Sequence, residues 1–332
     1  MNIRKETVGS TRGHAGQCPT PVDSYTLDTG DGLTVVVWTY GASTIEVLTP
    51  DRSGRVDNTV VRLPDLRSYQ DRRRNPYVGA TLGRYCRVVG DGTIRLDGVE
   101  HELDRNEGKH HVHGGGIGFD RYVWEADAER RDDELLLHLT LVTPDGDQGY
   151  PGTLSAEVIY RVDRHRRLTF EYQATSTAPT VVGLTNHAFW NLAGSGTVDQ
   201  QWLAVNADRA LVFDGELVPL PGPPAPLAGT ALDYREPRPI GDALIDNCFV
   251  LDDPAWAAEL YDPAGGRAMR VTTDQPGLGV YSADKFTDRP RGGLCLEAGA
   301  LPDPPGRNAS PFSRLDPGEV YRHRTTHEFL IR

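Results

Sequence analysis

The sequence predicts an all-β protein, folded as one large antiparallel β-sandwich with few short helices. Two observations lead to this prediction. Apolar and polar residues alternate over many short runs, which is the pattern of strands that bury one face. The chain also contains 36 Gly and 24 Pro, and these divide it into pieces too short for long helices.

Four stretches carry the strand pattern most clearly, at residues 33–38, 93–103, 135–142 and 154–172. In the second, Asp97-Gly98 separates two alternating runs and predicts a tight hairpin. In the last, the polar run 163–167 predicts a turn between two strands. Residues 64–69 begin with proline and predict a short helix of one or two turns.

The proline-rich segment 219–226 is the one candidate linker between domains. Strand-like segments continue on both sides of it without a shift in composition, so we favour a long surface loop within one sandwich. We therefore predict a single domain over residues 25–332, preceded by a poorly defined N-terminal extension over residues 1–24.

Charge and cysteine usage narrow the partners and the compartment. A formal net charge of -12 disfavours nucleic acids and anionic membranes, and we expect the only dense basic run, 72–74, to be a solvated loop. No apolar stretch approaches the roughly 20 residues of a membrane span, and no secretory signal is visible. Four scattered cysteines without a C-x-x-C pair indicate reduced thiols, so we expect a cytoplasmic protein.

A histidine cluster at 110–113 precedes the glycines at 114–116. On a strand His111 and His113 would share a face, which is the spacing of a cupin-type metal site, but the next glutamate, Glu125, lies too far along. A structural loop is a second interpretation. We favour a third, in which a histidine binds substrate; the glycines lack the strand-to-helix context of a phosphate loop.

Two further clusters place polar groups in apolar surroundings. Alternation puts His187 on the same face as Phe189 and Asn191, which suits either a carbohydrate-binding floor or a core histidine. Glu297 ends an apolar strand, and Asp246 precedes another. Each carboxylate is open to two interpretations, a solvated strand end or turn and a functional group.

Taken in order from about residue 25 to the C-terminus, these clusters resemble the aldose 1-epimerase (galactose mutarotase) family. The resemblance is carried by short motifs spread along the chain: Tyr40-Gly41-Ala42, Asn75-Pro76-Tyr77-Val78-Gly79-Ala80, Gly83-Arg84, His113-Gly114-Gly115, Gly118-Phe119-Asp120, Trp124, Asp145-Gly146, Gly149-Tyr150-Pro151-Gly152, Leu184-Thr185-Asn186-His187, Asn191-Leu192, Asp246, Leu296-Glu297 and Pro317-Gly318-Glu319-Val320-Tyr321.

The resemblance implies an isomerase that interconverts the anomers of a sugar, or of a sugar-like cyclic hemiacetal, on a galactose mutarotase-like supersandwich. It implies His187 as general acid and Glu297 as general base, and His113 and Asp246 as groups that hold substrate hydroxyls. We add Asn186, from the same motif, as a substrate contact. We expect no metal, no cofactor, no partner other than the small-molecule substrate, and a monomer or homodimer.

The chain departs from the family pattern at four positions near these motifs. Arg87 and Val88 stand where the family usually has Asn and Arg, and Gly279 and Gly299 stand where it usually has Gln. A site that lacks polar donors accepts a substrate with fewer hydroxyls, because unpaired buried donors are costly. Galactose itself is therefore left open.

We expect a deoxy or modified sugar, or the hemiacetal or ketal of a specialised metabolite, with Arg87 contacting an anionic group. The competing interpretation is a non-catalytic carbohydrate-binding protein with the same fold, because a fold does not guarantee an activity. Retention of His187 and Glu297 argues against that interpretation.

Overall fold

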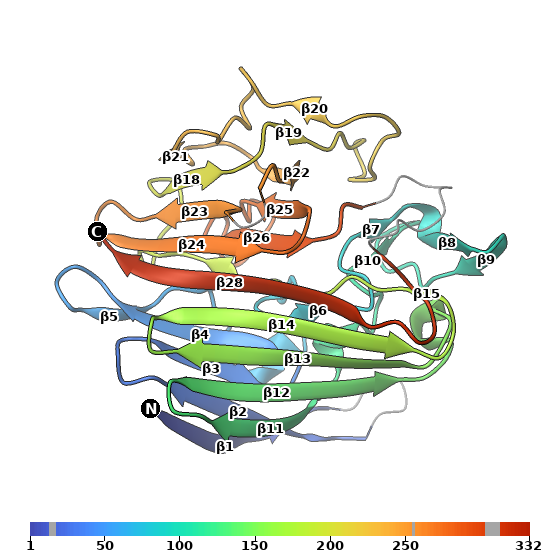
Figure 1. Ribbon diagram of the computed structural model, residues 1–332, viewed down its shortest axis with the longest axis horizontal. Helices are drawn as coiled ribbons and strands as arrows, with labels where there is room; N and C mark the ends of the chain where they lie inside the picture. Colours follow the sequence, from blue (N-terminus) through green and yellow to red (C-terminus); the bar gives the residue numbers. More distant parts are fainter. Residues whose placement is uncertain (13–17, 254–255, 303–312) are drawn as a thin grey trace.

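A computed structural model describes residues 1–12, 18–253, 256–302 and 313–332 of the chain. Its largest sheet has nine antiparallel strands and dominates the view in Figure 1. In spatial order they are β11 (Glu125–Arg130), β12 (Glu134–Thr143), β13 (Leu154–Asp163), β14 (Arg167–Ser176), β28 (Tyr321–Ile331), β24 (Arg267–Thr273), β23 (Ala258–Tyr261), β18 (Trp202–Val205) and β21 (Arg238–Pro239).

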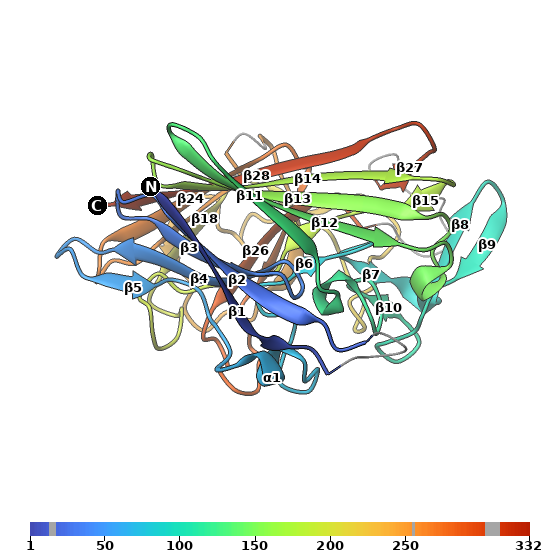
Figure 2. The ribbon, with the colours of Figure 1, turned by 90° about the horizontal axis from the view of Figure 1, so that it is seen from below.

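A five-stranded and a six-stranded sheet pack against this sheet through a common apolar core. Figure 2 shows the five-stranded sheet below the first strands of the nine-stranded sheet. The five-stranded sheet contains β1 (Asn2–Ser10), β2 (Pro21–Asp28), β3 (Thr34–Trp38), β4 (Ser43–Pro50) and β5 (Val56–Asn58). The six-stranded sheet contains β17 (Phe189–Trp190), β26 (Leu294–Gly299), β25 (Gly277–Tyr281), β22 (Asp246–Val250), β19 (Arg209–Ala210) and β20 (Ala225–Pro226).

The remaining elements are short. Pairs of strands are formed by β6 (Thr81–Leu82) with β16 (Thr185–Asn186), β7 (Val88–Val89) with β10 (His111–Val112), β8 (Thr93–Leu96) with β9 (Val99–Glu102), and β15 (Thr180–Val181) with β27 (Arg314–Leu315). The one α-helix of the described residues is α1 (Leu66–Tyr69); 3₁₀ turns occur at η1 (Gly90–Gly92), η2 (Phe119–Arg121) and η3 (Asp147–Gly149).

Alternating side chains build the core between the layers. Along β13, Leu154, Ala156, Val158, Tyr160 and Val162 are all buried and belong to the largest apolar cluster. That cluster also takes in residues from the five- and six-stranded sheets, so burial of the apolar faces holds the two layers together.

Most of the expected elements are confirmed. The all-β class is confirmed, Asp97-Gly98 joins β8 to β9, and the polar run 163–167 separates β13 from β14. The expected helix is α1, whose N-cap Asp65 accepts a hydrogen bond from the Ser68 amide. The proline-rich segment 219–226 contributes β20 to the six-stranded sheet.

The N-terminal segment differs from our expectation of a poorly defined extension. Residues 2–10 form β1, which pairs antiparallel with β2 along nearly its whole length. Few side chains of β1 are apolar, so hydrophobic periodicity gave no signal there, and main-chain hydrogen bonding to β2 defines the strand.

Within the described residues no helix is long and apolar enough to cross a membrane.

His327 lies on the inner face of β28 in an apolar environment. Its ring stacks on Trp190 at 4.9 Å between centroids and meets Phe170 edge-on at 5.5 Å. Neither ring nitrogen has a hydrogen-bond partner among the described residues. Burial lowers the pKa of His327 to about 3, so the folded protein holds this imidazole neutral at mildly acidic pH.

We therefore predict that His327→Phe makes the protein less sensitive to acid. The unfolded chain binds a proton at this histidine below about pH 6.5 while the folded chain does not, so stability falls as pH drops, by about 2 kcal/mol between pH 7 and 5. Denaturant unfolding at the two pH values should show that loss shrink by this amount in the variant. His165→Phe, at an exposed turn, should keep the wild-type loss; equal losses in both variants would contradict the prediction.

Candidate active site

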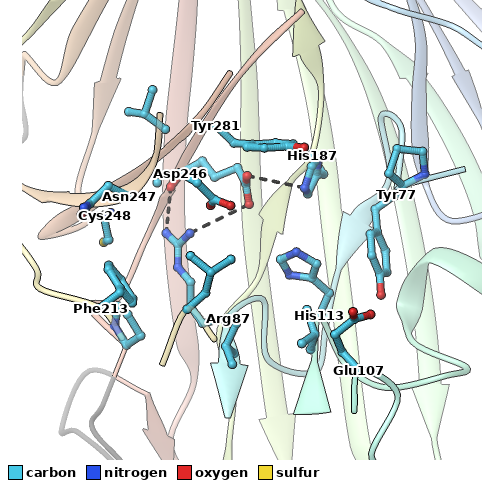
Figure 3. Close-up of a pocket in the computed structure, with 18 of the residues that line it drawn as sticks. Tyr77, Arg87, Glu107, His113, His187, Phe213, Asp246, Asn247, Cys248 and Tyr281 are labelled. Atoms are coloured by element: carbon cyan, nitrogen blue, oxygen red, sulfur yellow. Dashed lines mark hydrogen bonds and ion pairs between the residues drawn. The ribbon is translucent and has the colours of Figure 1, made fainter. Parts of the chain in front are cut away.

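A cavity of about 310 Å³ opens beside the six-stranded sheet, within the usual range for small-molecule sites. Strands β22, β25 and β26 supply one wall, and residues from segments 76–88, 107–113 and 213–217 supply the others. Figure 3 shows His113, His187, Asp246 and Arg87 around this one space. Five of the six residues that we expected at the site line the cavity: Arg87, His113, His187, Asp246 and Glu297.

Sheet register brings His187 and Glu297 together. Strand β17 pairs antiparallel with β26, with Phe189 opposite Cys295, and the same register continued by two residues sets His187 opposite Glu297. The His187 Nε2 atom lies 3.6 Å from the Glu297 Oε1 atom, and both side chains are about 6% exposed. An imidazole and a carboxylate therefore face each other on the cavity wall, where one ligand could contact both.

The main chain and a neighbouring ring fix the position of His187. Its amide donates to the Ala80 carbonyl at 2.8 Å, and its carbonyl accepts from the Gly79 amide at 2.9 Å. The imidazole lies 4.9 Å from the Phe189 ring between centroids, as the expected alternation required. The side chain of Asn191 donates to the Gly292 carbonyl at 2.9 Å and does not line the cavity.

The thiol of Cys295 lies behind His187. Its Sγ atom is 3.5 Å from His187 Nδ1, and one ligand atom each from His187, Cys295 and Glu297 lie within 4.8 Å of one another. This trio has the residue types of a metal site. Burial raises the pKa of the Cys295 thiol well above its ordinary value, so without a bound cation the thiol keeps its proton.

His111 and His113 do not share a face, which corrects the geometry required by the metal-site interpretation. Strand β10 ends at Val112, and His113 adopts a φ of 54°, so the alternation breaks between the two histidines. His111 is fully buried, with its Nδ1 2.6 Å from the Asp104 carbonyl and its Nε2 2.7 Å from the Tyr150 hydroxyl. Only His113 reaches the cavity.

His113 offers a hydrogen-bond acceptor to the cavity. Its Nδ1 lies 2.8 Å from the Cys86 carbonyl, which can only accept, so this nitrogen carries the proton. Burial, and secondarily the neighbouring His187, hold the pKa of His113 well below its ordinary value. The imidazole is neutral, and its Nε2 lone pair is available to a ligand hydroxyl.

Asp246 supplies a second acceptor at the cavity rim. It begins β22, opposite Tyr281 of β25, and its carboxylate lies 3.4 Å from the Lys285 ammonium group. Burial raises the pKa of Asp246, while Lys285 opposes the shift. The interpretation of Asp246 as a mere turn residue is therefore disfavoured, because its partly buried carboxylate lines the cavity.

Arg87 approaches Glu297 from the other side. Its Nη2 donates to the Glu297 main-chain carbonyl at 2.8 Å, and its Nη1 lies 3.9 Å from the Glu297 Oε2 atom. The Arg87 side chain is 10% exposed. The carboxylate of Glu297 is thus flanked by an imidazole at one oxygen and a guanidinium at the other.

Asn186 does not line the cavity, and its expected contact with substrate is corrected. The side-chain amide donates to the Gly79 carbonyl at 2.8 Å and to the Tyr160 hydroxyl at 3.3 Å. It lies on β16, where adjacent side chains point to opposite sides, so it supports the main chain next to His187 from behind.

The sequence did not reveal several other cavity residues. Tyr77 belongs to the motif at residues 75–80. Its φ of 64° marks a strained backbone position, but such strain is visible only in the structure. Its ring packs under Arg72, whose guanidinium also pairs with the buried Asp120 at 2.6 Å, so this arginine does not lie in a solvated loop as we expected. Phe213 and Leu217 come from a loop whose sequence carries no signal.

Comparison with known proteins places this arrangement in a family. The family model "Aldose 1-epimerase" matches residues 23–328. A galactose mutarotase of Sus scrofa is 32% identical, covering 98% of this chain and 99% of that protein. An aldose 1-epimerase of Escherichia coli (strain K12) is 30% identical, covering 93% and 96%. The structure of galactose 1-epimerase from Lactobacillus acidophilus NCFM matches with a TM-score of 0.88 at 28% identity, covering 99% of each chain.

We predict that His113 keeps its proton on Nδ1 and stays neutral as the pH falls from 8 to 5. Its depressed pKa leaves Nε2 unprotonated throughout this range, since protonation would bury a charge without a partner. Long-range ¹H–¹⁵N spectra of the imidazoles should show one His113 spin system with a constant tautomer, assigned by its absence in His113→Asn. Titration of that system with a midpoint near 6.5 would contradict the prediction.

Proposed function

Because this chain belongs to the aldose 1-epimerase family, and is therefore an isomerase that interconverts the anomers of a sugar, we propose that His187 and Glu297 perform its two proton transfers. The single observation that supports this assignment is the 3.6 Å approach of His187 Nε2 to Glu297 Oε1 on the cavity wall. Acid–base catalysis requires both groups within hydrogen-bond reach of one substrate.

The reaction needs one base and one acid. Glu297, as carboxylate, takes the proton of the anomeric hydroxyl, while His187, as imidazolium, gives a proton to the ring oxygen. The bond between the anomeric carbon and the ring oxygen breaks, and an open aldehyde forms. Rotation about the adjacent carbon–carbon bond presents the other face of the aldehyde, and reversal of both transfers closes the opposite anomer.

The positions of the two groups suit this chemistry. The anomeric hydroxyl and the ring oxygen are bonded to the same carbon, so the acid and the base must be neighbours, as His187 and Glu297 are. After ring opening Glu297 holds a proton and His187 has lost one, and the reverse transfers during ring closure restore both side chains by the end of the turnover. The proposed reaction therefore uses neither a metal nor a redox cofactor.

His113 and Asp246 complete the proposed substrate contacts. Both present acceptors to the cavity, the first as a neutral imidazole and the second as a carboxylate, so each would bind a sugar hydroxyl that donates. Hydrogen bonds of this kind orient the ring and keep the anomeric carbon next to the acid–base pair.

We predict that His187→Ala and Glu297→Gln each lose nearly all activity, because each proton transfer is typically worth about 100- to 10,000-fold in rate. Polarimetry of a freshly dissolved α-sugar, corrected for spontaneous mutarotation, measures the loss. Full activity in either variant would remove that residue from its proposed role.

A matched pair of controls lies elsewhere in the fold. His138 and Glu157 on β12 and β13 approach to 2.8 Å, with side chains 28% and 30% exposed, and neither lines the cavity. His138→Ala and Glu157→Gln should keep wild-type kcat, which shows that losing a histidine–glutamate contact is not harmful by itself.

We further propose that the substrate is a sugar with fewer hydroxyl groups or with an apolar substituent. Gly279, Val88 and Val280 line the cavity, as do Phe213 and Leu217 from the loop that borders it. A site with few hydrogen-bonding groups favours ligands with few hydroxyls, because each buried hydroxyl without a partner is costly. This proposal rests on the cavity lining and on the departures at positions 88, 279 and 299.

We predict that kcat/KM for 6-deoxygalactose exceeds that for galactose by about tenfold, which corresponds to one unfavourable polar burial of about 1.4 kcal/mol. Polarimetric rates on glucose, galactose, 6-deoxygalactose and 2-deoxyglucose, at matched concentrations, provide the comparison. A clear preference for galactose would overturn the proposed substrate class while leaving the acid–base assignment in place.

We also propose that the protein works in the cytoplasm as a monomer or homodimer. Cys18, Cys86, Cys248 and Cys295 are free, and all but Cys18 are buried, which suits a reducing compartment. The residues of the largest apolar cluster all come from one chain.

A further inference from the structure

Two glycines make room for Arg87 beside the proposed base. Gly279 on β25 pairs directly with Glu297 on β26, and Gly299 follows two residues after Glu297. A side-chain carbon at Gly279 would overlap Arg87 Nη1, and one at Gly299 would lie 3.3 Å from Nη2. The guanidinium therefore occupies a notch from which any side chain at 279 would displace it.

Within this notch the Arg87 guanidinium does not find a hydrogen-bond acceptor for each of its donors. Nη2 has the Glu297 carbonyl at 2.8 Å, whereas the buried Nε has no hydrogen-bond partner among the described residues. Burying a charge with imperfect partners is costly, and an apolar side chain would fill the same space more favourably. Buried, incompletely paired polar groups on a cavity wall indicate a functional role.

The Arg87 guanidinium and the Glu297 carboxylate lie next to each other on the cavity wall without a direct side-chain hydrogen bond. Nη1 lies 3.9 Å from Oε2, and Oε2 is buried without a hydrogen-bond partner in the described part of the chain. The gap is too wide for a direct hydrogen bond, and Oε2 is closed to a water-sized atom. A substrate hydroxyl that accepts from Nη1 and donates to this carboxylate therefore requires the two side chains to shift slightly apart. The other carboxylate oxygen, Oε1, is the one turned toward His187.

We propose that Arg87 is a catalytic residue that donates a hydrogen bond to the anomeric oxygen of the substrate; this rests on the proposed role of Glu297. Glu297 removes the hydroxyl proton, and the electron pair of that O–H bond becomes the second bond of the aldehyde. The electron pair of the carbon–ring oxygen bond passes to the ring oxygen, which takes its proton from His187. Arg87 gives up no proton and stays bonded to the anomeric oxygen throughout.

A fixed cation at this point favours the transition state. Negative charge gathers on the anomeric oxygen as its proton leaves, and a preorganised donor in a water-poor cavity stabilises such charge more than it stabilises the neutral hydroxyl. The other cation at the cavity, Lys285, has a side chain that is 68% exposed and pairs with Asp246 at the rim. It is not positioned to replace Arg87.

Arg87→Met and Arg87→Lys test the proposal. Loss of one such donor typically costs about 100- to 1,000-fold in kcat, so Arg87→Met should lose about that much with a KM change of less than about threefold. Arg87→Lys keeps the positive charge but loses the planar pair of N–H donors, and its kcat should lie between those of Arg87→Met and the wild type. A kcat within threefold of wild type in Arg87→Met would overturn the proposal.

A ligand that lacks the anomeric oxygen distinguishes a direct contact of Arg87 with that oxygen from a role in shaping the cavity. The probe is the 1,5-anhydro analogue of whichever aldose, glucose, galactose or 6-deoxygalactose, gives the highest kcat/KM. Its inhibition constant should change less than twofold in Arg87→Met, because the analogue lacks the atom that Arg87 contacts. A large, parallel weakening of the analogue would show that Arg87 only shapes the cavity, and would also overturn the proposal.

Gly279→Ala provides a second variant if Arg87→Met fails to fold. It keeps the arginine but displaces its Nη1, and a displacement of about 1 Å can cost about 10- to 100-fold in kcat. Wild-type kcat in Gly279→Ala would count against the proposal. Activity in Glu297→Gln would instead refute the proposed function, whereas inactive Glu297→Gln with fully active Arg87→Met refutes the role of Arg87 alone.

Discussion

The antiparallel register between β17 and β26 is the constraint on which the site depends. It aligns Phe189 with Cys295, and so brings His187 and Glu297 to the same edge from distant parts of the chain. Neither side chain belongs to the paired residues themselves. Main-chain hydrogen bonds of two short strands therefore set the distance between the proposed acid and base, and a slip by one residue would turn one of them away.

Burial makes that alignment consequential. Glu297 lies between His187 and Arg87, and all three side chains are 10% exposed or less. Charges in such surroundings interact more strongly than at a surface and are costly when left alone. The site balances these two effects by combining one carboxylate with two groups that can carry positive charge. One carboxylate oxygen, Oε2, is buried without a hydrogen-bond partner among the described residues.

Sequence reasoning failed where local geometry departs from simple alternation. The metal-site alternative requires His111 and His113 on one face, but the positive φ of His113 turns its side chain into the cavity while His111 bonds to Tyr150. Asn186 was expected at the site because it adjoins His187 in sequence. Its side chain points the other way and donates to the Gly79 carbonyl behind His187. The notch for Arg87 depends on Gly279 and Gly299, whose effect is visible only once β25 and β26 are paired.

The sequence by itself determined the all-β class, the turns at 97–98 and 163–167, and, through the order of its motifs, the family and four of the side chains that face the cavity. These follow from periodicity, turn residues and motif order, which are local properties of the chain. Only the tertiary structure decided which polar groups meet, how far His187 lies from Glu297, and that Arg87 lies beside Glu297. Such distances depend on the register and packing of strands far apart in sequence, and no local pattern encodes them.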